Sequence, residues 1–232
     1  MKQIYRFFLD IFFPKRCLGC NKAETFLCAE CAKKIELTLT PTCPNCGRIS
    51  EFNRYCITCK RELKPRLRGL LVASSFESGP TKEVIHHLKY AGFVELADVL
   101  GELIYQKIQA SGLKVNNFVI VPVPLHKKKL AERGFNQSEL IARYVAKRLD
   151  IPGGDALIRT KYTETQTKLS KEERIKNVSN AFACDDAEFI KNKNIFLIDD
   201  VTTTGSTLNA CADVLNIAGA KEVWGVVVAR RN

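Results

Sequence analysis

The sequence predicts an α/β fold built on a parallel sheet and preceded by a small cysteine-rich module. In the last two thirds of the chain, short apolar segments alternate with helical ones, which is the pattern of repeated β-α-β units. Eight of the ten cysteines lie within the first 59 residues. A chain of 232 residues can hold one medium-sized and one small domain, and we place these at residues 67–232 and 1–66.

Four C-x-x-C pairs account for the eight clustered cysteines. Each such turn places two sulfurs on one side of a tight loop, so two turns complete a tetrahedral zinc site. Short separations favour sequential pairing, and a cross-braced arrangement, in which the first pair joins the third, is the alternative. Four thiolates leave no open coordination position, so we expect two structural zinc ions. The sequential ligand sets are Cys17, Cys20, Cys28 and Cys31, and Cys43, Cys46, Cys56 and Cys59.

An apolar run, Phe7–Phe13, is interrupted only by Asp10. It is too short to span a bilayer, and no small-residue cleavage site follows it, so we predict neither a transmembrane segment nor a secretory signal. Residues 1–13 instead predict a short amphipathic helix that packs on the chain or contacts a partner or membrane surface. We therefore expect a cytoplasmic protein, in whose reducing environment clustered cysteines bind metal.

The charge is basic, with a formal net value of +11. Two zinc ions on eight thiolates would lower it by about 4. In the cysteine module, basic side chains are interleaved with Phe26, Phe52 and Tyr55, a mixture that permits phosphate contacts and base stacking. Protein docking and scaffolding are the alternatives. The basic residues are Lys22, Lys33, Lys34, Arg48, Arg54, Lys60 and Arg61.

Beyond a linker at residues 64–66, apolar runs and periodicity predict the elements of the second domain. Strands are expected at Leu70–Phe76, Phe118–Leu125, Ile195–Ile198 and Glu222–Ala229, with a short one near Ile158. Helices are expected at Lys82–Tyr90, Val94–Ala110, Ser138–Leu149 and Leu208–Ala218. The polar segment Lys161–Ala181 has the composition of a lid over an anionic ligand. Its relevant side chains are Gln166, Lys168, Lys171, Arg174 and Asn177.

The most informative stretch is Ile195–Thr207, in which a buried strand ends in Asp199 and Asp200 and a hydroxyl-rich loop and a helix follow. Ligands of open parallel sheets bind at the carboxyl ends of strands. Backbone N–H groups of such a loop, with the helix N-terminus behind them, form an anion cradle, and Gly205 permits close approach. The carboxylates would repel a bare phosphate and suit the hydroxyls of a ribose.

This combination resembles the phosphoribosyl pyrophosphate signature of type I phosphoribosyltransferases. The resemblance implies a parallel sheet of that family's type. It also implies that Asp199 and Asp200 hold the ribose hydroxyls of phosphoribosyl pyrophosphate. The 5′-phosphate would then be bound by the loop residues Thr202, Thr203, Thr204, Gly205, Ser206 and Thr207.

Further motifs narrow the family. Val121–Leu125 stands in the place of the pyrophosphate loop, and Arg133–Ser138 follows it. With Arg159, Phe182, polar residues of the predicted lid and the double zinc ribbon, nearly the whole chain is similar to the ComF family. That resemblance implies a cytoplasmic protein of natural transformation that acts on incoming single-stranded DNA. A DNA-translocating ATPase of the competence machinery is the candidate partner.

Phosphoribosyl transfer would release pyrophosphate, with Mg²⁺ bridging pyrophosphate and ribose oxygens. Candidate pyrophosphate contacts are His126, Lys127 and Arg133, next to Lys128 and Lys129. A structural histidine and a solvated basic face are the alternatives. Two functions follow. The first is a competence-associated factor that binds phosphoribosyl pyrophosphate and single-stranded DNA; the alternative is an active phosphoribosyltransferase whose acceptor the sequence does not identify.

Overall fold

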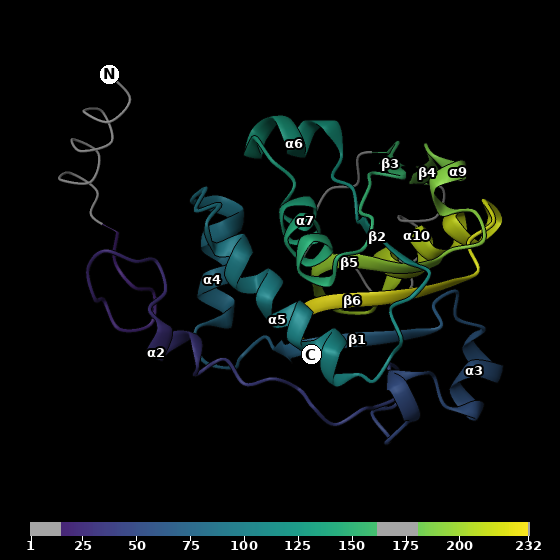
Figure 1. Ribbon diagram of the computed structural model, residues 1–232, viewed down its shortest axis with the longest axis horizontal. Coiled ribbons are helices and arrows are strands. Elements are labelled where there is room, and N and C mark those ends of the chain that lie inside the picture. Colours follow the sequence, from purple (N-terminus) through teal and green to yellow (C-terminus); the bar gives the residue numbers. More distant parts are fainter. Residues whose placement is uncertain (1–14, 162–180, 232) are drawn as a thin grey trace.

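The computed structural model describes residues 15–161 and 181–231. At its centre is a four-stranded parallel sheet in the order β1-β6-β5-β2 (Figure 1). The strands are β1 (Gly69–Ser75), β2 (Phe118–Pro122), β5 (Asn194–Thr202) and β6 (Glu222–Arg230). The two central strands, β5 and β6, are buried over most of their length, as parallel strands with both faces covered should be. The predicted parallel α/β fold is confirmed.

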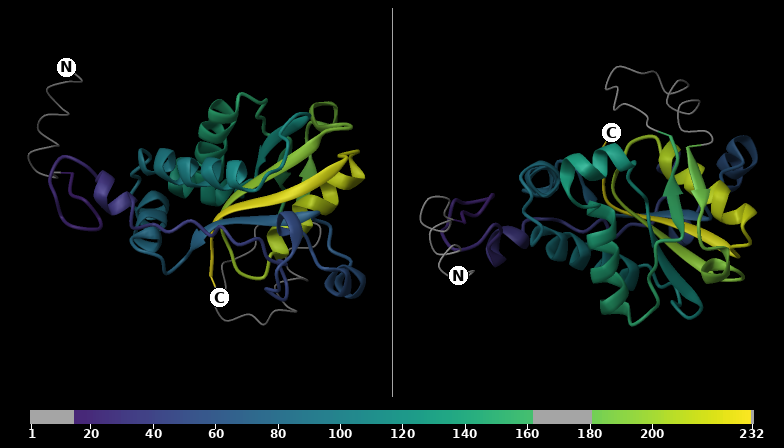
Figure 2. Two further views of the ribbon diagram at one scale, coloured as in Figure 1. Left: turned by 60° about the horizontal axis from the view of Figure 1, so that its bottom comes forward. Right: turned by 90° about the horizontal axis from the view of Figure 1, so that it is seen from above.

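Helices cover both faces of the sheet (Figure 2). Phe196 and Ile198 of β5 face one layer of the core, and Ile195 and Leu197 face the other, which is the period of two of a strand. The first layer is completed by α4 (Thr81–Tyr90), α5 (Leu96–Ala110) and α7 (Gln137–Leu149). The second is completed by α10 (Ser206–Ile217). Within the described ranges, no helix has the length and apolar content needed to cross a bilayer.

Short elements flank both ends of the sheet. The helix α6 (Lys127–Arg133) follows the carboxyl end of β2, and α9 (Ala187–Ile190) precedes the amino end of β5. β3 (Leu157–Arg159) pairs antiparallel with β4 (Phe182–Cys184), so this two-stranded sheet flanks residues 162–180. The predicted lid therefore lies almost wholly outside the described residues, and so does the predicted amphipathic helix at residues 1–13.

The expected elements correspond closely to the observed ones, with three informative differences. β2 ends at Pro122, earlier than predicted, because the two prolines of the Val-Pro-Val-Pro run cannot donate ladder hydrogen bonds. β5 extends to Thr202 and so includes both aspartates, since the ladder to β6 continues beyond the apolar residues. The lysine-rich helix α6 was not expected, because it lacks an apolar face: none of its residues is buried.

The N-terminal module lies along the sheet domain. Its first ribbon, with α2 (Ala29–Ala32), lies beside α4, and its second, with η1 (Glu51–Asn53) and α3 (Ile57–Leu63), lies at the other side of the molecule (Figure 1). The segment between them follows β1, where Thr38 N donates to Ala73 O at 2.8 Å.

The first ribbon shares the core of the larger domain, and the second contacts that domain. In the first, Cys17 and Cys31 belong to the same buried cluster as α4 and α5, and Phe26 stacks on Phe93 with ring centroids 3.9 Å apart. In the second, the Arg54 guanidinium lies 5.6 Å from the centroid of Trp224, a buried residue of β6. The module is thus packed against the domain at both ends.

Candidate functional site

Two adjacent carboxylates occupy the carboxyl end of β5, where a parallel sheet binds its ligands. Asp199 and Asp200 are only 9% and 3% exposed. Side chains of α7 hold both of them: Ser138 Oγ donates to Asp199 Oδ1 at 2.9 Å, and Gln137 Nε2 donates to Asp200 Oδ1 at 3.2 Å. The helix and the strand together fix the orientation of the acid pair.

A lysine from a third element completes this arrangement. The Lys89 ammonium, at the end of α4, forms an ion pair with Asp200 Oδ2. Burial alone would raise the pKa of Asp200, but the charge of Lys89 outweighs it, so this pKa lies below its ordinary value. The pKa of Lys89 is raised in turn, because the charge of Asp200 outweighs the effect of burial.

Asp199 is shifted in the opposite direction. Burial and then the neighbouring charge of Asp200 raise its pKa from 3.8 to about 7. Its Oδ1 also accepts the backbone N–H of Asp200 at 2.9 Å. The pair can therefore share a single proton near neutral pH, which is the usual outcome when two carboxylates lie together in a buried site.

The loop after β5 has the geometry of an anion site. Gly205 has φ of +75° and caps α10, a backbone conformation that favours glycine. The hydroxyls of Thr204 and Ser206 lie 2.7 Å apart, and Asn209 Nδ2 donates to Gly205 O at 3.1 Å. The first N–H groups of a helix lack intrahelical acceptors, so this end of α10 attracts negative charge.

A group of four cationic side chains lies next to the acid pair and consists of Lys89, Lys129, Arg133 and Arg159. Burial, followed by the charges of Arg159 and Arg133, lowers the pKa of Lys129. Burial likewise lowers the pKa of Arg159, against the opposing charge of Asp199. Arg133 donates to Gln137 Oε1 and lies over the Tyr90 ring, 5.5 Å from its centroid. Cations that lower one another's pKa in this way favour a ligand with several negative charges.

The predicted pyrophosphate residues divide between this group and the surface. Arg133 belongs to the site, whereas Lys127 and Lys128 are exposed on α6. His126 is the N-cap of that helix, and its Nδ1 accepts the N–H of Lys128 at 3.2 Å. This hydrogen bond supports the alternative that His126 has a structural role.

Several candidate functional residues were not predicted from the sequence. In the sequence, Lys89 is only one polar residue of an amphipathic helix. Its contact with Asp200 arises from the way the chain folds, so no local pattern predicts it. Gln137 and Ser138 belong to a motif that the sequence singled out, but their contacts with the acids were not foreseen. The remaining two cysteines belong to the core, where Cys211 is fully buried and Cys184 packs against the same cluster.

The eight N-terminal cysteines form two clusters in the sequential arrangement. In each, the four sulfurs lie within 4.8 Å of one another. Four sulfurs about 2.3 Å from a zinc ion would lie about 3.8 Å apart. The structure has 3.6 Å between the sulfurs of Cys20 and Cys28, and 3.8 Å between those of Cys46 and Cys56. The donor set therefore fits tetrahedral zinc, and the cross-braced alternative is excluded.

Backbone N–H groups donate hydrogen bonds to these sulfurs and so stabilise the thiolate form that binds a cation. Cys28 N donates to Cys17 Sγ at 3.3 Å, and Cys56 N donates to Cys43 Sγ at 3.4 Å. Burial would raise the pKa of the Cys17 thiol, but such hydrogen bonds outweigh burial and lower this pKa to about 6. Thiolates, not thiols, bind zinc. With all four ligands supplied by the protein, each ion would be structural.

Comparison with known families agrees with both halves of this description. Residues 94–232 match the phosphoribosyl transferase domain family, and residues 8–65 match the double zinc ribbon domain family. The fold and the site thus define a phosphoribosyltransferase-domain protein with an N-terminal double zinc ribbon. Among solved structures, the allosteric regulatory enzyme of purine biosynthesis is 22% identical, with 57% of this chain and 26% of that chain covered and a TM-score of 0.40.

Individual relatives narrow the family. Competence protein F of Haemophilus influenzae is 32% identical, with 94% of this chain and 99% of the relative covered. DNA utilization protein YhgH of Escherichia coli is 32% identical over 85% of this chain and 88% of its own. Competence protein ComFC of Bacillus subtilis is 31% identical over 86% and 82%. The chain belongs to the ComF family of competence and DNA utilization proteins.

Proposed function

We propose that this protein binds phosphoribosyl pyrophosphate at the carboxyl edge of its sheet and single-stranded DNA elsewhere, as a factor in natural transformation. The observation that supports the first part is the combination of a buried acid pair, a hydroxyl-rich loop at the start of α10 and four neighbouring cations. Phosphoribosyl pyrophosphate carries a ribose diol between a phosphate and a pyrophosphate, so its groups match this order of acceptors and donors.

Each part of the ligand has its own residues in this proposal. Asp199 and Asp200 accept the ribose hydroxyls, and the loop from Thr202 to Thr207 donates to the 5′-phosphate. Lys129, Arg133 and Arg159 attract the pyrophosphate. Mg²⁺ would neutralise part of the pyrophosphate charge, held by ligand oxygens and few protein groups.

When phosphoribosyl pyrophosphate binds, Lys89 and Asp200 would exchange their ion pair for contacts with the ligand. In the described state the ammonium satisfies Asp200, which is almost fully buried. When a ribose hydroxyl takes this carboxylate oxygen, Lys89 becomes available to the pyrophosphate. The carboxylate then keeps a hydrogen-bond donor and the ammonium gains an anionic partner, whereas a buried charge with no partner would cost several kcal/mol.

The DNA part of the proposal has separate support. Relatives named for competence and DNA utilization share 82% or more of their length with this chain. The formal net charge of +11 suits a phosphodiester backbone. We place the protein in the cytoplasm, where reduced cysteines can keep zinc, and infer a DNA-translocating ATPase of the competence machinery as its partner.

The ligand site is tested by thermal unfolding with phosphoribosyl pyrophosphate and Mg²⁺. The melting temperature should rise, because ligand binds only the folded state. In an Asp199→Asn/Asp200→Asn variant this ligand-induced rise should vanish, even though the baseline melting temperature also changes. The exposed acids Asp185 and Asp186 provide a control with the same pair of substitutions, and their Asn variant should keep the rise. Equal rises in both variants would contradict the ribose assignment.

A second candidate function is catalysis of phosphoribosyl transfer. It is favoured by the four cations, which could stabilise a departing pyrophosphate as well as bind it. The reaction would then release pyrophosphate in the presence of Mg²⁺ and an acceptor such as an amine, a base or a DNA end. Measuring pyrophosphate separates the two functions: binding without release for every acceptor favours the binding factor.

A further inference from the structure

A second basic site lies away from the acid pair, in a groove between the second zinc ribbon and the amino end of the sheet. Its volume is about 440 Å³. One wall is the ribbon and α3, and the other is formed by the residues before β1, the end of α10 and the start of β6. Its charged lining residues are Arg54, Lys60, Arg66, Arg68, Lys221 and Glu222.

Five cations in this lining face a single carboxylate, so positive charge is in excess. Glu222 pairs with Arg68 at 3.4 Å, and Asp213 pairs with Arg66 at 2.9 Å. Among the residues that the structure describes, Lys60 and Lys221 form no ion pair, and both are exposed.

Arg54 is held by aromatic rings instead of by an acid. Its guanidinium lies 5.3 Å from the Phe52 centroid and 5.6 Å from that of Trp224. Its Nε is buried and has no hydrogen-bond acceptor among the described residues. Since no described carboxylate pairs with this guanidinium, this part of the groove favours an anionic ligand.

The same lining offers an apolar contact. Ile57, at the start of α3, is 87% exposed. A ligand that combines repeated negative charges with apolar faces satisfies both features, whereas free phosphate would use only the cations. Single-stranded nucleic acid has this composition, and narrow basic grooves track its backbone.

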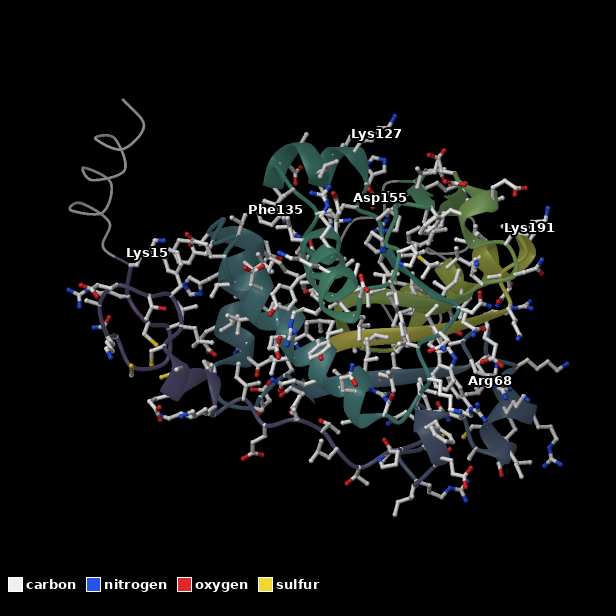
Figure 3. All side chains as sticks on the ribbon, in the orientation of Figure 1. Lys15, Arg68, Lys127, Phe135, Asp155 and Lys191 are labelled. Carbon is white, nitrogen blue, oxygen red and sulfur yellow. The ribbon has the colours of Figure 1, made fainter. Side chains whose placement is uncertain are left out.

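We propose that this groove is the binding surface for single-stranded DNA, separate from the phosphoribosyl pyrophosphate site; this rests on the DNA part of the proposed function. The groove meets Asn216 at the end of α10, and the phosphate loop stands at the beginning of that helix. Twelve helical residues span about 18 Å. Arg68, in the lining of the groove, and Lys127, on α6, lie at opposite sides of the molecule (Figure 3). DNA and phosphoribosyl pyrophosphate therefore bind together without competing.

The test measures fluorescence anisotropy of a labelled oligothymidylate over a series of salt concentrations. Lys60→Glu/Lys221→Glu should weaken binding about tenfold or more, and losing two backbone contacts should reduce the slope of log affinity against log salt by about 1.4. Lys33→Glu/Lys34→Glu, in the first ribbon, changes the net charge equally and should leave affinity within about twofold and the slope unchanged. Lys221→Glu alone lies outside the zinc ribbon and should show about half of the slope change.

Each result has one meaning. Wild-type protein that does not bind the oligonucleotide at low salt, with both zinc sites full, removes the DNA part of the proposed function and this inference with it. Wild-type binding with unchanged affinity in the groove variants overturns the groove alone. So does displacement of the oligonucleotide by phosphoribosyl pyrophosphate with Mg²⁺, which would put DNA at the acid pair. Tighter binding of a duplex of equal length would also overturn the single-strand assignment.

Discussion

Neighbouring carboxylates with opposite pKa shifts are the central feature at the scale of single residues. Asp199 and Asp200 share one buried position at the end of β5, yet only Asp200 has an ammonium as partner. With the pKa of Asp199 at about 7, the pair binds one proton about half of the time at neutral pH. A ligand with hydroxyl donors or a divalent cation would displace that proton.

This arrangement predicts a pH-dependent effect for Asp199→Asn. The folded pKa of Asp199, about 7, lies above its ordinary value of 3.8, so the folded state binds more protons between these values. That contribution to stability is complete below the lower pKa and is lost as pH rises through the upper one. Asparagine does not titrate. The melting temperature of the variant relative to wild type should therefore increase from about pH 5 to about pH 8.

Thermal melts of both proteins across this pH range provide the measurement. The matched Asp185→Asn variant, at an exposed acid, should show a flat difference. A flat difference for Asp199→Asn as well would mean that this carboxyl titrates normally and that Lys89 serves both acids equally.

At the scale of elements, the loop between β5 and α10 depends on one backbone conformation. Gly205 has positive φ, and a non-glycine residue there costs about 1 kcal/mol or more. Its carbonyl accepts from Asn209, whose Oδ1 accepts the N–H of Arg66 at 3.1 Å. The phosphate loop is thus connected through one side chain to the segment that joins ribbon and sheet.

We expect Gly205→Ala to weaken phosphoribosyl pyrophosphate binding. The strained turn should shift the N–H groups at the start of α10, and losing one or two of their bonds to a phosphate would reduce affinity about tenfold or more. Gly92 has a similar φ of +73° in the loop after α4 and open space around it, so Gly92→Ala carries the same backbone cost away from the site. Calorimetric titration compares the two. Equal affinities would show that the loop does not hold the phosphate.

Strong local signals explain which of these elements the sequence could predict. The apolar run Ile195–Ile198 predicted a buried strand, and the acids and hydroxyls that follow it predicted a ligand site. Helix α6 and strand β4 were missed because neither has an apolar run long enough to be recognised. Contacts such as Lys89 with Asp200, or Lys60 and Lys221 with one groove, join residues more than 100 positions apart. They depend on strand order, which no local pattern encodes.

At the scale of the whole molecule, the two zinc ribbons lie at opposite sides of one domain (Figure 1). The first shares its buried cysteines with α4 and α5, and the second contacts β1 and β6. Lys107, buried in α5, donates to Thr38 O in the segment between the ribbons. Zinc binding is therefore coupled to the folding of the sheet domain and not only to the local turns.

The last prediction follows from this shared core. Purified protein should carry two zinc ions, and Cys43→Ser/Cys46→Ser should lose one while the first cluster keeps its own. Calorimetry of the wild type should show one cooperative transition, because the buried cysteines of the first ribbon belong to the main core and cannot separate without exposing it. The variant should melt at a lower temperature. Two resolved transitions in the wild type, or two zinc ions in the variant, would mean that the ribbons fold independently or that other residues hold the metal.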